Sequence, residues 1–268
     1  SHLYFAHNIQ MNKRNIIVKE GTDDVFLIIC DHASNRIPKE YDNLGIKSAE
    51  IISHRAFDIG AADVAKELSK KLKCTLIMSN FSRLLIDPNR GIDDPTLIPK
   101  LSEGIKIKGN IGITNTGNDK ERLKRIKNFY LPYHKEIESF LSITLKNNIV
   151  PKIISIHSFT PTWKGKKRDT EIGILWDKDD RLSSIFLKSL KNNICGNNQP
   201  YNGRLVNDTL YRHATLKGIP HILIEIRQDL LQSNKERLLW AEKIYDILIN
   251  NENNIKSFKI ENYGSYAK

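Results

Sequence analysis

Residues 25–32 read VFLIICDH, an apolar run closed by an aspartate and a histidine. A short unbroken apolar run is typical of a strand that is buried on both faces, as in a parallel sheet. Two further runs follow the same pattern: KIISI at 152–156 comes directly before His157, and ILI at 222–224 comes directly before Glu225. These runs predict three buried strands, and each ends beside a side chain capable of chemistry: His32, His157 or Glu225.

Helical patterns separate the predicted strands. Apolar side chains recur at helical spacing between residues 57 and 72, which predicts an amphipathic helix that opens near Asp58. Further helices are predicted at 121–145, with a kink or division at Pro132, at 181–192 and at 231–249. Short strands are predicted at 75–78, 84–86 and 172–176, and a long loop region at 88–116. The alternation predicts an α/β sandwich with a mixed, largely parallel sheet.

Composition limits the class of protein. The 268 residues, 40% of them hydrophobic and 27% charged, predict one globular domain over 1–268 with about 15 peripheral residues at each end. The net charge of +11 comes from scattered lysines, so we expect a solvated basic surface and no nucleic-acid partner. No apolar run is long enough to cross a membrane. Isolated Cys30, Cys74 and Cys195 favour a reducing compartment, the cytoplasm. The oligomeric state stays open.

Two histidines at strand ends favour a metal site. Ligand sites of open α/β sheets lie at the carboxyl ends of the strands, and neutral imidazoles there suit one zinc-type divalent ion that keeps an open position. Such a site needs a third protein ligand. We prefer Asp58 as this ligand, because a helix N-terminus stabilises its charge. Asn35 and His54 are alternative ligands. In another interpretation Asp58 only caps the helix.

Other charged residues complete a candidate site. Glu225 can accept the proton of a metal-activated water, although a structural pair with Arg227 on the same strand face is the alternative. The segment SRLLIDPNR at 82–90 contributes Arg83, Asn89 and Arg90, which suit a substrate carboxylate or, alternatively, a salt-bridge network. His213 belongs to a polar stretch that can line the cleft. The sequence contains no GxGxxG, GxxxxGK[ST] or GxSxG motif, which argues against nucleotide binding and serine esterase chemistry.

Taken together, the motifs resemble the N-formylglutamate amidohydrolase family, over roughly residues 25–232. The matching segments, in chain order, are DHASNRIP, HRAFDIGAADVA, SRLLIDPNR, YLPYHKEI, IHSFTP, EIGILW and LIEIRQDL. The family is distantly similar to zinc carboxypeptidases and aspartoacylases. The resemblance therefore implies a phosphorylase/hydrolase-like three-layer α/β/α fold and zinc-assisted hydrolysis of an acidic N-formyl or N-acyl amino acid.

The resemblance also implies roles for single residues. His32, His157 and Asp58 would hold the metal, Glu225 would be the general base, and Arg83 would polarise the scissile carbonyl. Asn89 and Arg90 would bind the substrate carboxylate. Asn35, Arg227 and His213 are further candidates for substrate binding. Asn35 stands where the carboxypeptidase-type signature has a glutamate, and DHASN stands where enzymes of histidine breakdown more often have PHSG. A zinc carboxypeptidase or peptide amidase, and a non-catalytic binding protein on the same scaffold, are the alternative functions.

Overall fold

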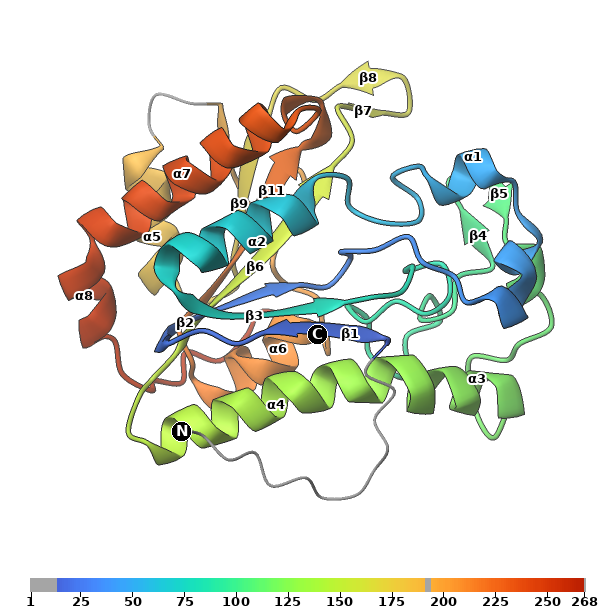
Figure 1. The fold of residues 1–268 in the computed structure, drawn as a ribbon, viewed down its shortest axis with the longest axis horizontal. Helices are drawn as coiled ribbons and strands as arrows, with labels where there is room; N and C mark the ends of the chain where they lie inside the picture. Colours follow the sequence, from blue (N-terminus) through green and yellow to red (C-terminus); the bar gives the residue numbers. More distant parts are fainter. Residues whose placement is uncertain (1–13, 191–193, 268) are drawn as a thin grey trace.

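A seven-stranded mixed sheet forms the centre of the molecule (Figure 1). The computed structural model describes residues 14–190 and 194–267. In spatial order the strands are β1 (Ile16–Lys19), β3 (Cys74–Ser79), β2 (Asp23–Cys30), β6 (Lys152–Phe159), β11 (His221–Arg227), β9 (Ile172–Leu175) and β10 (Cys195–Asn197). The four central strands β3, β2, β6 and β11 are parallel, whereas β1 and β9 run antiparallel to their inner neighbours. The predicted mixed, largely parallel sheet is confirmed.

Helices cover both faces of the sheet, which makes three layers (Figure 1). Side chains alternate along a strand. In β2, Ile28 therefore packs on one face, with α2 (Ala61–Leu72), α5 (Arg181–Ser189), α7 (Asn234–Asn250) and α8 (Glu252–Ser257). Leu27 packs on the other face, with α4 (Leu131–Lys146) and α6 (Thr209–His213). This architecture confirms the expected α/β/α sandwich.

Pro132 marks a change of helical pitch. The predicted helix 121–145 is α3 (Lys120–Arg125), a π-helical turn (Ile126–Tyr130) and then α4, in which Pro132 is the second residue. Proline has no N–H to donate and its ring crowds the preceding turn, so the helix widens ahead of it. The helix nevertheless runs on without a break from Lys120 to Lys146, so the kink or division expected at Pro132 takes only the form of this π-helical turn.

A separate apolar cluster fills the loop region beside the sheet. The predicted strand 84–86 is wrong: these residues form turns, and their apolar side chains are buried in this cluster. A short apolar run cannot by itself distinguish a strand from a buried loop. The small elements here are the irregular 3-10 helix Lys39–Gly45, α1 (Ser48–Ile51), β4 (Leu101–Ser102), β5 (Ile105–Lys106) and the 3-10 helix Lys108–Asn110.

Several boundaries differ from the prediction. The helix expected from residue 57 begins at Ala61, so Asp58 lies in the turn before α2 and does not open it. The end of the helix expected at 181–192 falls partly outside the described residues. The last long helix begins at Asn234, because Ser233 and Glu236 form a reciprocal capping box there. The remaining short elements are β7 (Thr162–Trp163), β8 (Lys166–Lys167), and the 3-10 helices Thr215–Lys217 and Gln228–Leu230.

The C-terminal segment, which the sequence predicts to be peripheral, is held against the body by hydrogen bonds. The Tyr266 backbone N–H donates to Asp177 Oδ1 at 2.8 Å, and Ser265 donates to the other oxygen of the same carboxylate. The Glu261 N–H donates to the Gly218 carbonyl at 2.9 Å. Most of the expected N-terminal peripheral stretch lies outside the described residues. Within the described chain, no helix combines the length and apolarity needed to span a bilayer.

Candidate active site

The catalytic candidates meet at the carboxyl ends of the central parallel strands. His157 in β6 lies directly opposite Glu225 in β11 in the strand register. His32 follows β2, the strand on the other side of β6, by two residues. Adjacent parallel strands therefore bring together three side chains that are far apart in the sequence, as the strand-end pattern predicts.

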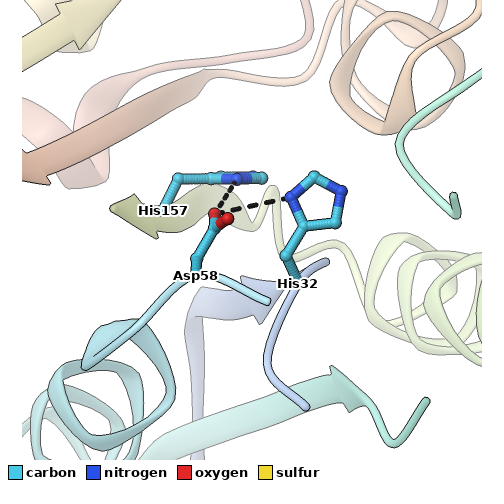
Figure 2. A group of neighbouring side chains, drawn as sticks. All are labelled: His32, Asp58 and His157. Carbon is cyan, nitrogen blue, oxygen red and sulfur yellow. Dashed lines mark hydrogen bonds and ion pairs between the residues drawn. The ribbon is translucent and has the colours of Figure 1, made fainter. Parts of the chain in front are cut away.

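Asp58 joins the two histidines (Figure 2). Its Oδ2 lies 2.8 Å from His157 Nδ1 and 3.4 Å from His32 Nδ1. One donor atom from each of the three buried side chains lies within 4.8 Å of the others, an arrangement able to hold a metal ion. The turn before α2 is fixed by the Asp58 N–H, which donates to the His32 carbonyl at 2.9 Å. The same backbone bond thus sets the spacing of two of the three side chains.

The outer nitrogens of both imidazoles contact buried carboxylates. His32 Nε2 is 2.7 Å from Asp87 Oδ1, and His157 Nε2 is 3.0 Å from Asp31 Oδ2. A carboxylate at the outer nitrogen fixes the tautomer and leaves the Nδ1 lone pair for a metal. His32 Nδ1 is buried without a hydrogen-bond partner in the described structure. Two imidazole nitrogens and a carboxylate oxygen, each oriented this way, form a donor set that fits a divalent ion of the zinc type.

The charge of the site also favours a cation. Asp31, Asp58 and Asp87 are all nearly inaccessible to solvent. Arg83 contacts two of them, at 3.4 Å from Asp58 and 3.2 Å from Asp87. Burial lowers the pKa of His157, but Asp31 and Asp58 outweigh it and hold that pKa well above the ordinary range. The cluster therefore attracts positive charge, which a metal ion in place of imidazole protons would supply.

Glu225 has the environment of a proton-transfer group. It is 7% exposed, and its Oε2 is buried with no hydrogen-bond partner in the described residues. Burial raises the pKa of this carboxyl to about 7, against the lowering effect of His157. Arg227 does not pair with it, because its guanidinium binds Asp229 at 2.7 Å. The structural-pair alternative is therefore wrong, and Glu225 is left facing the cleft.

A cleft of about 650 Å³ contains these groups. Asn89 and Arg90 line it, as expected of substrate-binding residues. Arg90 makes no ion pair within the described residues and is held by Thr96 Oγ1 at 3.3 Å and the Asn89 carbonyl at 3.2 Å. A guanidinium that already has a fixed position but no carboxylate partner is suited to bind an acid.

Three expected site residues lie elsewhere. Asn35 does not line the cleft, because its side chain donates to the Ile51 carbonyl at 3.1 Å. His54 reaches only the rim, where Glu103 holds it at 2.7 Å. The guanidinium of Arg227 also donates to the carbonyls of residues 168–170 and lies outside the lining. The structure thus corrects the substrate-binding expectation for Asn35 and Arg227, and brings Asp58, not Asn35 or His54, to the two imidazoles.

His213, also expected to line the cleft, forms a buried pair with His134. The rings stack with centroids 5.1 Å apart, and His213 Nε2 is 2.8 Å from His134 Nδ1. His134 Nε2 lies 2.8 Å from the Pro88 carbonyl, to which only an N–H can donate. Burial lowers the pKa of both imidazoles, so both rings are neutral near pH 7, and His134 Nδ1 then accepts the hydrogen bond that His213 Nε2 donates. The pair positions the loop that carries Asp87 and Asn89, which is a structural role.

We expect this pair to weaken the fold in acid. Burial lowers the pKa of His134 to about 3 and that of His213 to about 2. Unfolded histidines bind a proton below about pH 6.5, so the unfolded state takes up more protons and stability falls as the pH drops. Between pH 7 and pH 5 this costs roughly 2 kcal/mol per histidine. In urea unfolding, His213→Phe should lose about 2 kcal/mol less over this range than the wild type; equal losses would show that His213 is not held neutral.

Several residues of the site were not predicted. Asp31, at the end of the first strand run, accepts from Tyr133 at 2.7 Å and from Thr209 at 2.8 Å besides His157. Its place directly before His32 was the available signal. The cleft lining also includes Trp163, Tyr201, Arg204 and Asp208. These lie in segments without periodicity, and nothing in the sequence pattern distinguishes them from ordinary loop residues.

Comparisons with known proteins found one matching family model and several similar solved structures. A family model described as N-formylglutamate amidohydrolase matches residues 25–232. A solved structure of a gene product from Agrobacterium tumefaciens is 33% identical, with a TM-score of 0.84 over 91% of this chain and 96% of the other. An N-formylglutamate amidohydrolase from Ralstonia eutropha JMP134 is 15% identical, with a TM-score of 0.54 over 90% and 98%, and shares the fold. No curated protein matches in sequence.

Proposed function

Because the chain belongs to the N-formylglutamate amidohydrolase family and is therefore a hydrolase acting on amide bonds, we propose that it cleaves an N-formyl or N-acyl amino acid with the help of one zinc ion. The observation that carries the proposal is the group of His32, Asp58 and His157 with Glu225 in the same cleft. Buried carboxylates orient the two imidazoles for metal binding. Glu225 Oε2 has no hydrogen-bond partner among the described residues, which suits a group that transfers protons.

The proposed metal ligands are the two Nδ1 atoms and the Asp58 carboxylate. Nitrogen and carboxylate donors are those that zinc takes in catalytic sites with three protein ligands. Asp31 contacts His157 Nε2 at 3.0 Å, and Asp87 contacts His32 Nε2 at 2.7 Å. These carboxylates orient the two rings from the side opposite the proposed metal. A divalent ion bound there supplies a Lewis acid for the amide carbonyl and eases deprotonation of the attacking water.

Glu225 is the proposed proton shuttle. As a carboxylate it accepts the proton of the attacking water, and as the resulting acid it donates that proton to the departing amine nitrogen. A pKa of about 7 leaves both forms accessible near neutral pH.

Arginines bind and polarise the substrate in this proposal. Arg83 is 27% exposed at the side chain although Asp58 and Asp87 hold it, so part of its guanidinium faces the cleft. It adds positive charge near the carbonyl oxygen as that oxygen becomes negative. Arg90, with Asn89 beside it, binds the substrate carboxylate and fixes its orientation.

One experiment tests the whole proposal. Metal content is measured by plasma mass spectrometry, and release of formate or acetate from N-formyl and N-acetyl amino acids is followed with and without chelator. We expect stoichiometric zinc and chelator-sensitive release. Cleavage of dipeptides alone would favour a carboxypeptidase or peptide amidase. Absence of both metal and hydrolysis, even with added zinc, would instead indicate a binding protein on this scaffold.

A further inference from the structure

Arg204 is a second guanidinium in the cleft without a carboxylate partner. It lines the cleft from the loop that precedes α6 and is exposed. Among the described residues it forms no ion pair. Its guanidinium carbon instead lies 4.6 Å from the ring centroid of Tyr266, a cation–π contact. Tyr266 comes from the C-terminal segment, outside the residues that the family model matches.

Trp176 and Asp177, which directly follow β9, hold the segments that carry Arg204 and Tyr266. Gly203 packs so closely on Trp176 that a Cβ would lie 2.5 Å from the Trp176 backbone nitrogen, so the loop is fixed beside Arg204. The next residue, Asp177, accepts from the Tyr266 N–H at 2.8 Å. The loop of Arg204 is thus held at Trp176, and the C-terminal segment is held at Asp177. Because these two residues are adjacent in the chain, they fix Arg204 and Tyr266 relative to each other.

The remaining arginines of the lining are already neutralised. Arg83 contacts Asp58 and Asp87, and Arg55 lies 3.1 Å from Glu50. Within the described part of the chain, this leaves Arg90 and Arg204 as the lining guanidinium groups without an acidic partner. They lie on two different loops of the same cleft. Two such groups are suited to a ligand with two separated anionic groups.

We infer that Arg204, positioned by Tyr266, binds the second carboxylate of a dianionic N-acyl amino acid, while Arg90 binds the first. The inference rests on the proposed function and adds to it a specificity-determining residue. Tyr266 is a positioning residue, because it acts through the guanidinium that it stacks on. The C-terminal segment thereby contributes to substrate choice without contacting the reacting atoms.

The test compares N-formyl-L-glutamate with its neutral isostere N-formyl-L-glutamine. The readout is the ratio of their kcat/KM values, with kcat and KM recorded separately. Arg204→Ala should lower the ratio about tenfold through KM, since a charge-assisted hydrogen bond is lost. Arg204→Lys should recover part of it. Tyr266→Ala should lower the ratio about threefold, and Tyr266→Phe should leave it near the wild-type value.

A double-mutant cycle separates positioning from a general structural effect. If Tyr266 acts through Arg204, Tyr266→Ala should change nothing further in the Arg204→Ala background. The matched control is Tyr263→Ala. Tyr263 belongs to the same C-terminal segment, but its ring stacks on Arg181, at 4.9 Å from the guanidinium carbon to the ring centroid and away from the cleft. An unchanged ratio in Arg204→Ala, or additive effects in the cycle, would overturn the inference.

Failure of the proposed function gives a different result. The wild type would then hydrolyse neither compound, and calorimetric titration with the same two compounds would decide the role of Arg204. Tighter binding of the glutamate compound that disappears in Arg204→Ala supports the inference. Equal binding of the two compounds by the wild type contradicts it.

Discussion

Glu225→Gln should lower kcat for amide hydrolysis by about 10²- to 10⁴-fold, the range that a positioned general acid–base group contributes. Glutamine keeps the size of the side chain but can neither accept the water proton nor pass it to the amine. Because Glu225 Oε2 has no hydrogen-bond partner among the described residues, the amide breaks no existing contact, and the fold should be retained. Metal content should stay at the wild-type level, since the side chain is not one of the proposed ligands.

The measurement is steady-state hydrolysis on metal-loaded protein, with metal content and thermal unfolding determined on the same preparation. Glu242→Gln is the matched control. The Glu242 carboxylate pairs with Lys71 at the molecular surface and does not line the cleft. Near-wild-type turnover in Glu225→Gln would show that another group transfers the proton. Buried Asp208, whose pKa burial raises to about 7 and which also lines the cleft, would be the next candidate.

The strand ends made part of the site predictable. An apolar run that is buried on both faces must lie inside a sheet, and parallel neighbours align their carboxyl ends. His157 and Glu225 follow from this rule alone, since the register places them side by side. Asp58 required a further fact, because it lies in a turn and meets the histidines through a single backbone hydrogen bond from its N–H to His32.

The outer contacts were not predictable from periodicity. Asp87 directly follows the residues 84–86 for which a strand was predicted, but it occupies a loop whose apolar residues are buried in a cluster of their own. Its contact with His32 depends on how that loop packs, which in turn depends on His134 reaching the Pro88 carbonyl. Arg204 and Tyr266 meet because of two tertiary anchors, Trp176 and Asp177. Such contacts between loops leave no repeating pattern in the sequence.

His157→Ala should abolish stoichiometric metal binding, because it removes one of three proposed ligands from the centre of the site. Metal affinity should fall by far more than the 10- to 100-fold expected for loss of an outer contact. The variant would also leave Asp31 and Asp58 buried without the imidazole that lies between them at 3.0 Å and 2.8 Å. Buried carboxylates that lose a partner take up protons more readily, so the fold should also become less stable.

The matched control is His54→Ala, which tests the alternative ligand as well. His54 pairs with Glu103 at the rim, and its loss should leave metal content and turnover unchanged. Metal is measured by plasma mass spectrometry after dialysis against a defined free zinc concentration, and unfolding is followed in parallel so that loss of metal is not mistaken for loss of fold. Full metal occupancy in folded His157→Ala, or loss of metal in His54→Ala, would mean that the ion is held by a different set of side chains. In that case the contact of His157 with Asp31 and Asp58 would be a structural ion-pair network, and the catalytic role of the cleft would depend on Glu225 and Arg83 without a metal at this position.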